Sequence, residues 1–281
     1  MPSIYCPVCG ECRESTQVFV CKSFPILRCS TCGVGKTQLP SDFSTDGIYS
    51  EGYFQGEQAD GYSDYAGSEN VLRAEFRSAV EDLRDAGAGG GRLLEIGCAY
   101  GFFLAEAKPY FEVEGIDVSE SAVRFCRSRG LEVERGSLTE EYVRQRPPYD
   151  AAVMLDVVEH LTEPDRVMEL LRRAMKPGGR LLISSGDWES NGSRIAGSHW
   201  RLMTPPQHTF FFSPRTMSAM LARVGFDVIQ CRKPWKTVPL GLIAYQLGRF
   251  VGMRKPPRLR GVHWGLPINL FDAFRMAAVR R

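Results

Sequence analysis

The pattern of apolar and polar positions in the middle of the chain alternates between two periods. Short, mostly apolar runs predict five buried strands, at 92–96, 113–116, 131–133, 150–155 and 180–185. Apolar residues at helical spacing, each stretch followed by glycine or proline, predict helices at 71–84, 102–108, 119–130 and 164–175. Strands that alternate with helices predict an α/β fold, with a mostly parallel sheet and helices on both faces.

Composition narrows the class of protein. The chain has 281 residues, of which 43% are hydrophobic and 24% charged, as in globular domains, so disorder, collagen and coiled coil are excluded. Its length fits one large domain or two modest ones. No apolar run reaches the ~20 residues that a membrane-spanning helix needs, and residues 1–6 carry no signal-peptide pattern. We therefore expect a cytoplasmic protein.

Six of the nine cysteines fall within the first 32 residues, and four of them form two C-x-x-C-G knuckles, with nineteen residues between Cys9 and Cys29. This spacing is typical of zinc ribbons. Four thiolates suit tetrahedral Zn(II) and leave no position for a substrate, so we predict a structural zinc ribbon over residues 1–40. Disulfides, or replacement of one ligand by Cys12 or Cys21, are the alternatives. The predicted zinc ligands are Cys6, Cys9, Cys29 and Cys32.

A strand, a glycine-bearing turn and a helix follow one another over residues 94–104. Gly97 and Gly101 let the backbone approach a ligand closely, and Asp117 ends the next strand, where a carboxylate can accept both hydroxyls of a ribose. The spacing E-x-G-x-x-x-G differs from the G-x-G-x-x-G of dinucleotide sites, and the negative charge of Glu95 favours a cationic ligand over a pyrophosphate. These residues predict an adenosine-type site for S-adenosylmethionine, which carries a sulfonium and an ammonium.

The chain from about residue 70 to residue 230 resembles the class I S-adenosylmethionine-dependent methyltransferases. The motifs that carry the resemblance are EIGCAYG at 95–101, IDVS at 116–119, YDAAVMLDVVEHL at 149–161, MKPGGRLLIS at 175–184, HTFFFS at 208–213 and GFDV at 225–228. The resemblance implies a Rossmann-like, seven-stranded, mostly parallel sheet whose last strand is antiparallel, within a methyltransferase domain over 71–235. The cofactor-binding residues that it implies are Glu95, Gly97, Cys98, Tyr100, Gly101, Asp117, Val118, Ser137, Leu138 and Asp156.

The N-terminal knuckles and the aromatic residues after them look like a bacterial subgroup with an N-terminal zinc ribbon, some members of which methylate sugars or other secondary metabolites. A purely solvated linker would not need so many aromatic side chains, so we expect those of the connector 41–70 to pack against the main domain or line its mouth. These side chains are Tyr49, Tyr53, Phe54, Tyr62 and Tyr65.

Methyl transfer is an in-line displacement at the sulfonium carbon, in which the enzyme positions the nucleophile and removes water. A hydroxyl nucleophile also benefits from a base. His160, just past the fourth strand, and His208, at the start of a later strand, are the candidates for base or substrate orienter. Packing and capping roles are the alternatives, and His199 and His263 are expected to be peripheral. No D/N-P-P-Y/F motif stands at Asp156, so O- or C-methylation is favoured over methylation of an exocyclic base nitrogen.

The net charge of +2 conceals a basic C-terminal segment. Residues 223–281 hold twelve Lys or Arg against two acids, a net charge of +10, so the preceding residues carry −8. Residues 240–253 are mostly apolar, and 254–260 are strongly basic. We predict that 236–281 form a basic extension, which either packs on the sheet as a lid or lies on an anionic membrane surface at the inner face.

These features predict a methyltransferase that acts by O- or C-methylation on a small molecule, a sugar or a lipid-linked glycan of bacterial secondary or envelope metabolism. An RNA methyltransferase that uses the ribbon and the tail is one alternative. Residues 1–33 hold three Lys or Arg against two acids, so the ribbon is hardly basic and nucleic acid is disfavoured as a partner. A non-catalytic scaffold is the other alternative, and the intact set of loop residues argues against it.

Overall fold

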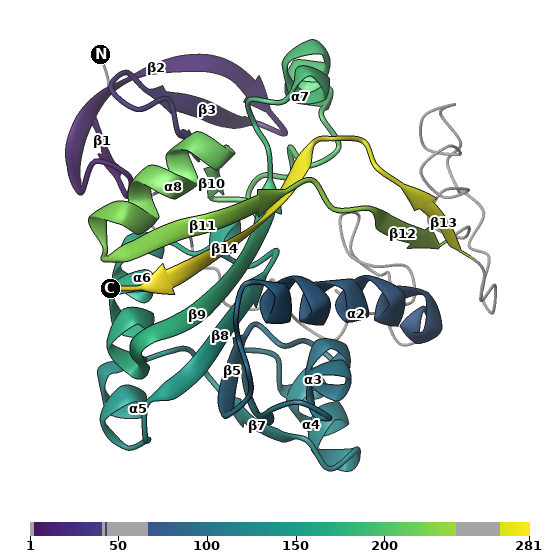
Figure 1. The fold of residues 1–281 in the computed structure, drawn as a ribbon. Helices are drawn as coiled ribbons and strands as arrows, with labels where there is room; N and C mark the ends of the chain where they lie inside the picture. The colour runs from purple at the N-terminus through teal and green to yellow at the C-terminus, as the bar shows by residue number, and fades with distance from the viewer. Residues whose placement is uncertain (1–2, 41–42, 44–66, 240–264) are drawn as a thin grey trace.

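The computed structural model describes residues 3–40, 43, 67–239 and 265–281. Its centre is a seven-stranded sheet in the order β11-β14-β9-β8-β5-β6-β7 (Figure 1). In that order the strands are Phe226–Arg232, Ala273–Arg280, Met175–Gly186, Tyr149–Leu155, Arg92–Ile96, Glu112–Asp117 and Glu132–Arg135. Strands β5 to β9 run parallel, whereas β14 is antiparallel to both of its neighbours. The predicted sheet, with its antiparallel last strand, is confirmed.

Helices cover both faces of this sheet, as predicted. Neighbouring residues of β5 show why, because Leu93 packs into one apolar cluster with α2, α3 and α4, and Leu94 packs into another with α5, α6 and α8. Strands buried on both faces read as continuous apolar runs, which is how the sequence revealed them. The helices are Glu69–Asp85 (α2), Phe102–Ala107 (α3), Glu120–Ser128 (α4), Glu140–Arg144 (α5), Pro164–Ala174 (α6), Asn191–Ala196 (α7) and Pro214–Arg223 (α8).

The C-terminal strand departs from the expected basic extension. Residues 273–280 form β14, which lies between β9 and β11 inside the sheet, so the prediction of an extension over the whole of 236–281 does not hold there. Six of the eight residues of β14 are buried. The sequence analysis overlooked this mostly apolar strand because it counted the net charge over the whole C-terminal segment. Before it, Lys236–Pro239 (β12) pairs with Gly265–Ile268 (β13). The predicted apolar and basic stretches over 240–260 lie outside the described residues.

A buried ion pair fastens β14 to α2. Arg275 is 3% exposed and donates from Nη1 to Oδ2 of Asp82 at 2.6 Å. Replacing Asp82 with alanine leaves this guanidinium buried without its charge partner, so we expect the free energy of unfolding to fall by about 3 kcal/mol. Asp85→Ala is the matched control, because Asp85 pairs at 3.2 Å with the half-exposed Arg232 and its loss should cost less than about 1 kcal/mol. Urea unfolding measures both, and equal losses would contradict the assignment.

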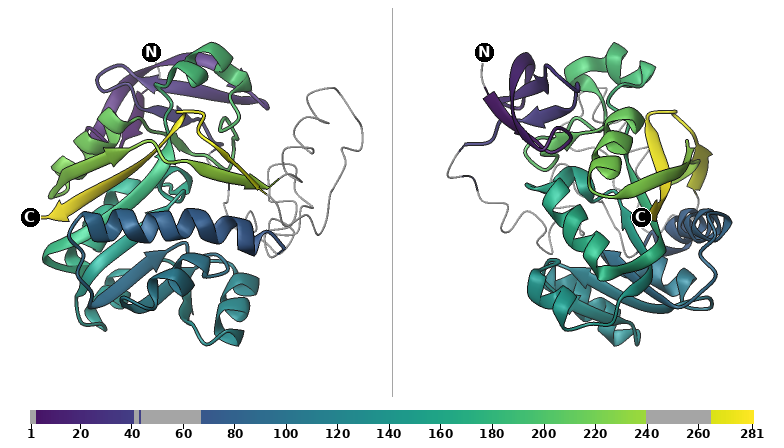
Figure 2. Two further views of the ribbon diagram at one scale, coloured as in Figure 1. Left: turned by 45° about the vertical axis from the view of Figure 1, so that its right-hand side comes forward. Right: turned by 60° about the vertical axis from the view of Figure 1, so that its left-hand side comes forward.

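The N-terminal strands form a second sheet together with a strand from the later part of the chain. They are Ser3–Cys6 (β1), Glu11–Cys21 (β2), Phe24–Cys29 (β3) and Gly35–Thr37 (β4). With Phe210–Phe211 (β10) they form a five-stranded sheet, in which β4 pairs with β10. Figure 2 shows these strands, in purple, beside α8. Cys6, Cys29 and Val34 share one apolar cluster with Phe210 and Phe212, so the predicted ribbon shares both a sheet and a core with the rest of the chain.

Two expectations concern parts of the chain that the structure describes incompletely. The five aromatic side chains of the predicted connector 41–70 all lie outside the described residues. In the described ranges, no helix is long and apolar enough to cross a membrane.

Candidate functional site

The glycine-bearing loop after β5 adopts the tight turn that the sequence predicted. Gly97 and Gly101 have φ values of 71° and 70°, and Ala99 between them has a φ of 45°, so three residues occupy the left-handed region. A Cβ on Gly97 would lie 2.5 Å from Cγ2 of Val157. The loop after β5 and the turn after β8 are therefore in close contact at the carboxyl edge of the sheet.

Asp117 ties this loop to the next helix. Its Oδ2 accepts from the backbone N–H of Ala99 at 2.7 Å, and its Oδ1 accepts from that of Ser119 at 2.8 Å. Burial raises the pKa of Asp117, and these two donors lower it in part. Each carboxylate oxygen retains a lone pair beyond these bonds, which leaves room for the predicted ribose hydroxyls. Val118, beside it, is 52% exposed and is open to a flat ligand.

Glu95 lies in β5, two residues before Gly97, and is 3% exposed. Its Oε2 is buried and has no hydrogen-bond partner among the described residues. Burial raises the pKa of Glu95 well above its usual range. A cationic group bound against this loop would favour the charged carboxylate, so the side chain fits the predicted sulfonium and ammonium of the cofactor.

The remaining predicted cofactor residues divide between the core and the surface. Cys98 is buried, and a Cβ on Gly115 would lie 2.8 Å from its sulfur, so its side chain points into the sheet. Tyr100 is also buried and stacks on Phe125 with ring centroids 4.5 Å apart. Neither side chain faces outward from the loop, and both pack against the core below it. Ser137 is exposed and Leu138 buried, next to Gly136, whose N–H donates to the backbone oxygen of Asp117 at 2.9 Å.

Asp156 begins the turn that follows β8. Its φ is 54°, an uncommon value for a residue other than glycine and one that often marks a functional site. Ser184 of β9 holds it in place, because its Oγ donates to Oδ1 of Asp156 at 2.8 Å and accepts from the Asp156 N–H at 3.0 Å. The sequence did not single out Ser184, since its role depends on the pairing of β8 with β9.

The two candidate histidines meet beside Asp156, although 48 positions separate them in the chain. The rings of His160 and His208 lie 4.6 Å apart at an interplanar angle of 76°. Nδ1 of His160 lies 2.9 Å from the backbone oxygen of Gln207. Burial lowers the pKa of His160, and burial and the neighbouring His160 lower that of His208 well below its usual value. Both imidazoles are therefore neutral near pH 7.

Glu159 is a member of this group that the sequence analysis did not select. It lies with His160 on a 3-10 turn, Val158–His160, and is 4% exposed. One ligand atom from each of Glu159, His160 and His208 lies within 4.8 Å of the others. The signal in the sequence was the Glu-His pair directly after a buried strand, but its contact with His208 depends on the tertiary fold.

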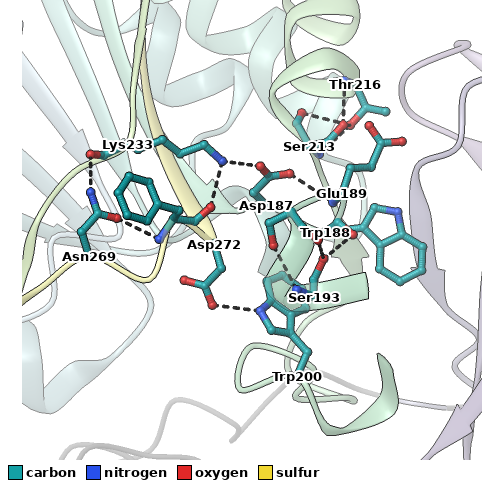
Figure 3. A network of polar contacts seen from close by, with 12 residues as sticks. Asp187, Trp188, Glu189, Ser193, Trp200, Ser213, Thr216, Lys233, Asn269 and Asp272 are labelled. Atoms are coloured by element: carbon teal, nitrogen blue, oxygen red, sulfur yellow. Dashed lines mark hydrogen bonds and ion pairs between the residues drawn. The ribbon is translucent and has the colours of Figure 1, made fainter. Parts of the chain in front are cut away.

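A polar network holds the segment that follows β9. Asp272, directly before β14, accepts from Nε1 of Trp200 at 2.9 Å (Figure 3). It also pairs with Arg201 at 2.8 Å. Lys233, after β11, pairs with Asp187. The irregular segment around Trp200 is thereby held at the start of β14, and Asp187 is held at the end of β11. His199, within it, is exposed, and His263 lies outside the described residues.

The four predicted zinc ligands converge, with their sulfur atoms within 4.8 Å of one another. Sγ of Cys6 lies 3.4 Å from that of Cys32 and accepts from the Cys9 N–H at 3.5 Å. Ligands around a zinc ion with bonds of ~2.3 Å lie about 3.8 Å apart, so the four thiols fit such an ion. Burial raises the pKa of Cys9 to about 11, and a bound cation would reverse this. None of the nine cysteines forms a disulfide, and Cys12 and Cys21 lie outside the cluster.

Comparison with known proteins agrees with this arrangement. A family profile described as a methyltransferase domain matches residues 69–231, more than half of the chain. The chain belongs to this methyltransferase family. The methyltransferase family that the sequence predicted is thereby confirmed.

Curated relatives of the methyltransferase include two proteins named ubiquinone biosynthesis O-methyltransferase. The one from Xylella fastidiosa is 28% identical over 164 residues, which cover 52% of this chain and 67% of that protein. The one from Pseudomonas aeruginosa is 29% identical over 156 residues, which cover 51% of this chain and 67% of that protein.

Solved structures of similar fold include an S-adenosylmethionine-dependent methyltransferase from Thermotoga maritima, with a TM-score of 0.53 and 18% identity, over 82% of this chain and all of that one. Another, from Archaeoglobus fulgidus, has a TM-score of 0.53 and 21% identity, over 74% of this chain and 94% of that one. At these identities the likeness shows the fold alone.

Proposed function

We propose that this methyltransferase transfers the methyl group of S-adenosylmethionine to a hydroxyl oxygen of a small molecule. The observation that carries the proposal is the contact of His160 with His208 beside Asp156. Val157, in the same turn, lies directly against the glycine loop, so the histidines lie close to the predicted cofactor. The names of the relatives in Xylella fastidiosa and Pseudomonas aeruginosa, which are O-methyltransferases, support the same reaction.

The cofactor would be held by groups with separate tasks. Asp117 would accept the ribose hydroxyls, and the loop between Gly97 and Gly101 would offer backbone close to the methionyl part. The buried carboxyl of Glu95 would face the positive charge of the ligand from beneath. S-adenosylmethionine supplies an activated methyl group, and the chain itself orients the nucleophile and excludes water.

The acceptor would lie against the imidazoles. A neutral imidazole can accept a hydrogen bond from a hydroxyl and so orient its oxygen toward the methyl carbon. As the new O–C bond forms and the C–S bond breaks, the hydroxyl proton passes to the imidazole that accepts its hydrogen bond, and the sulfur becomes a neutral thioether. The expected acceptors are small hydroxyl compounds, with sugars and lipid-linked glycans among the candidates.

Zinc would act at a distance from this chemistry. The four-thiolate site would fold the ribbon, whose strand β4 contacts the segment that carries His208. Oγ1 of Thr37, in β4, donates to the backbone oxygen of His208 at 2.6 Å, and its N–H donates to the backbone oxygen of Thr209 at 2.9 Å. A structural zinc site would therefore hold one wall of the acceptor site in place.

The test is single substitution at the two histidines. Calorimetry with S-adenosylmethionine should give dissociation constants within threefold of the wild-type value for His160→Ala and His208→Ala, since neither side chain would hold the cofactor. Methyl transfer to a panel of phenols, catechols and sugars, followed as S-adenosylhomocysteine, should fall about 100-fold or more. Near-normal turnover in both variants would refute a role for the pair. A wild-type protein that binds neither cofactor nor product would refute the proposed function itself.

A further inference from the structure

The carboxyl group of Asp272 holds the segment 200–202. Asp272 is 5% exposed, and its Oδ2 accepts from Nε1 of Trp200 at 2.9 Å (Figure 3). Arg201 makes a two-point pair with the same group, from Nε to Oδ2 at 2.9 Å and from Nη2 to Oδ1 at 2.8 Å. Burial opposes the charge of this carboxyl, but the bonds with Arg201 and Trp200 outweigh it and lower the pKa of Asp272. A charged two-point pair of this kind fixes orientation as well as position.

The segment 200–202 also packs against the end of β9. A Cβ on Gly186, the last residue of that strand, would lie 2.7 Å from Cδ1 of Leu202 and 3.0 Å from Cη2 of Trp200. Glycine at this position therefore lets both side chains lie directly on the strand. The segment is thus held from two sides, by its packing on β9 and by the carboxylate of Asp272.

The same segment reaches the second candidate histidine. The backbone oxygen of Thr204, two residues further on, accepts from the N–H of His208 at 3.1 Å. Burial lowers the pKa of His208, and a hydrogen bond between its ring and the backbone of Leu202 raises it in part. A bond that raises this pKa is one in which the carbonyl oxygen accepts from the imidazole. The neutral ring then keeps its other nitrogen as a hydrogen-bond acceptor.

We propose that Asp272 is a positioning residue for methyl transfer, which holds the segment 200–202 so that the backbone of Leu202 orients the imidazole of His208 toward the acceptor. This rests on the proposed O-methylation. The unprotonated nitrogen of His208 accepts the proton of the acceptor hydroxyl as the O–C bond forms, and the electrons of the C–S bond return to sulfur. Asp272 exchanges no proton in this step, and its charge serves to fix the segment that the imidazole is bonded to.

The first measurement needs no acceptor. Nuclear magnetic resonance of protein that contains isotope-labelled histidine reports the tautomer and the hydrogen bonds of each imidazole, and the signals lost in His208→Ala are those of His208. Asp272→Asn, which keeps the size of the side chain and removes its charge, should shift these signals. Asp187→Asn is the matched control, because Asp187 is also 5% exposed and pairs with Lys233, outside the segment 200–202. It should leave the signals of His208 at their wild-type positions.

The second measurement is methyl transfer to the panel of phenols, catechols and sugars. Asp272→Asn should lower turnover about tenfold or more, since a small misplacement of a catalytic group has effects of this size. Its dissociation constant for S-adenosylmethionine should stay close to the wild-type value, which also checks that the variant is folded. In a His208→Ala background the same substitution should have little further effect on turnover, because Asp272 acts through His208.

Arg201→Lys covers the case in which Asp272→Asn does not fold. Lysine keeps the positive charge but cannot form the two-point pair, so the signals of His208 should shift in the same direction and by a smaller amount.

Two results would overturn the positioning role. One is a set of His208 signals that neither Asp272→Asn nor Arg201→Lys shifts. The other is an equal loss of turnover from Asp272→Asn with and without His208, which is what a merely structural role would give. Normal turnover in His208→Ala, in contrast, would count against the proposed use of this histidine. A wild-type chain that does not bind S-adenosylmethionine would count against the proposed function itself.

Discussion

Replacement of Cys6 by serine is expected to abolish zinc binding and, with it, methyl transfer. Cys6 is fully buried, and its sulfur lies 3.4 Å from that of Cys32 at the centre of the four-thiol cluster. In small zinc domains the metal contributes about 10 kcal/mol or more of folding free energy, so the ribbon should unfold without it. Because Cys6 shares an apolar cluster with Phe210 and Phe212, the damage should reach the segment that carries His208.

Cys12→Ser is the matched control, because Cys12 is exposed and lies outside the cluster. Elemental analysis should find about one zinc per chain in the wild type and in Cys12→Ser, and none in Cys6→Ser. The unfolding temperature and the rate of methyl transfer should be unchanged in Cys12→Ser and should both fall in Cys6→Ser. A Cys6→Ser protein that keeps a full equivalent of zinc, or one that loses zinc and works normally, would show that the cluster has another purpose.

Alanine at Gly101 is expected to lower the free energy of unfolding by about 3–5 kcal/mol and to weaken S-adenosylmethionine binding at least tenfold. Two costs add up, since φ at this position is +70° and the new Cβ would lie 2.5 Å from Cδ1 of Leu131 and 2.9 Å from Sγ of Cys126. Relief of the overlap moves the loop that begins at Gly97. Chemical denaturation and calorimetry measure the two effects separately.

Gly130→Ala separates the strain from the clash. Gly130 has the same φ of +70°, but a Cβ there would meet no atom within 4 Å. It should therefore lose about 1–2 kcal/mol, the cost of a left-handed alanine, and bind the cofactor normally. If the two variants lose equal stability, packing against Leu131 and Cys126 does not explain the need for glycine at 101.

The prediction of the cofactor side of the candidate site depends on local signals. The loop at Gly97 and Gly101 and the acid at Asp117 follow from a strand, a turn and a helix that are contiguous in the chain, and the structure places them together. The direction in which each side chain of the loop points was harder to predict. Cys98 and Tyr100 belong to the same motif, yet their side chains point into the core, because a turn does not reveal which of its side chains face inward.

Long-range pairings account for what the sequence did not predict. The contact of His160 with His208 and the position of Glu159 depend on β10, which pairs with a strand of the ribbon and not with its neighbours in sequence. The antiparallel strand was expected from the resemblance, but its residues were counted as a basic tail. Arg275 shows the reason, because a cation buried against Asp82 has the same appearance in a sequence as one on the surface.

The position of β14 also bears on how this enzyme is made. Strands β9 and β11 are both synthesised well before Ala273–Arg280, and until that stretch emerges their facing edges have no partner. Unpaired edges recruit strands from other molecules. A chain that is truncated before residue 273 would therefore aggregate instead of folding into an enzyme of reduced activity. During synthesis, β9 and β11 would need the protection of chaperones until β14 has emerged.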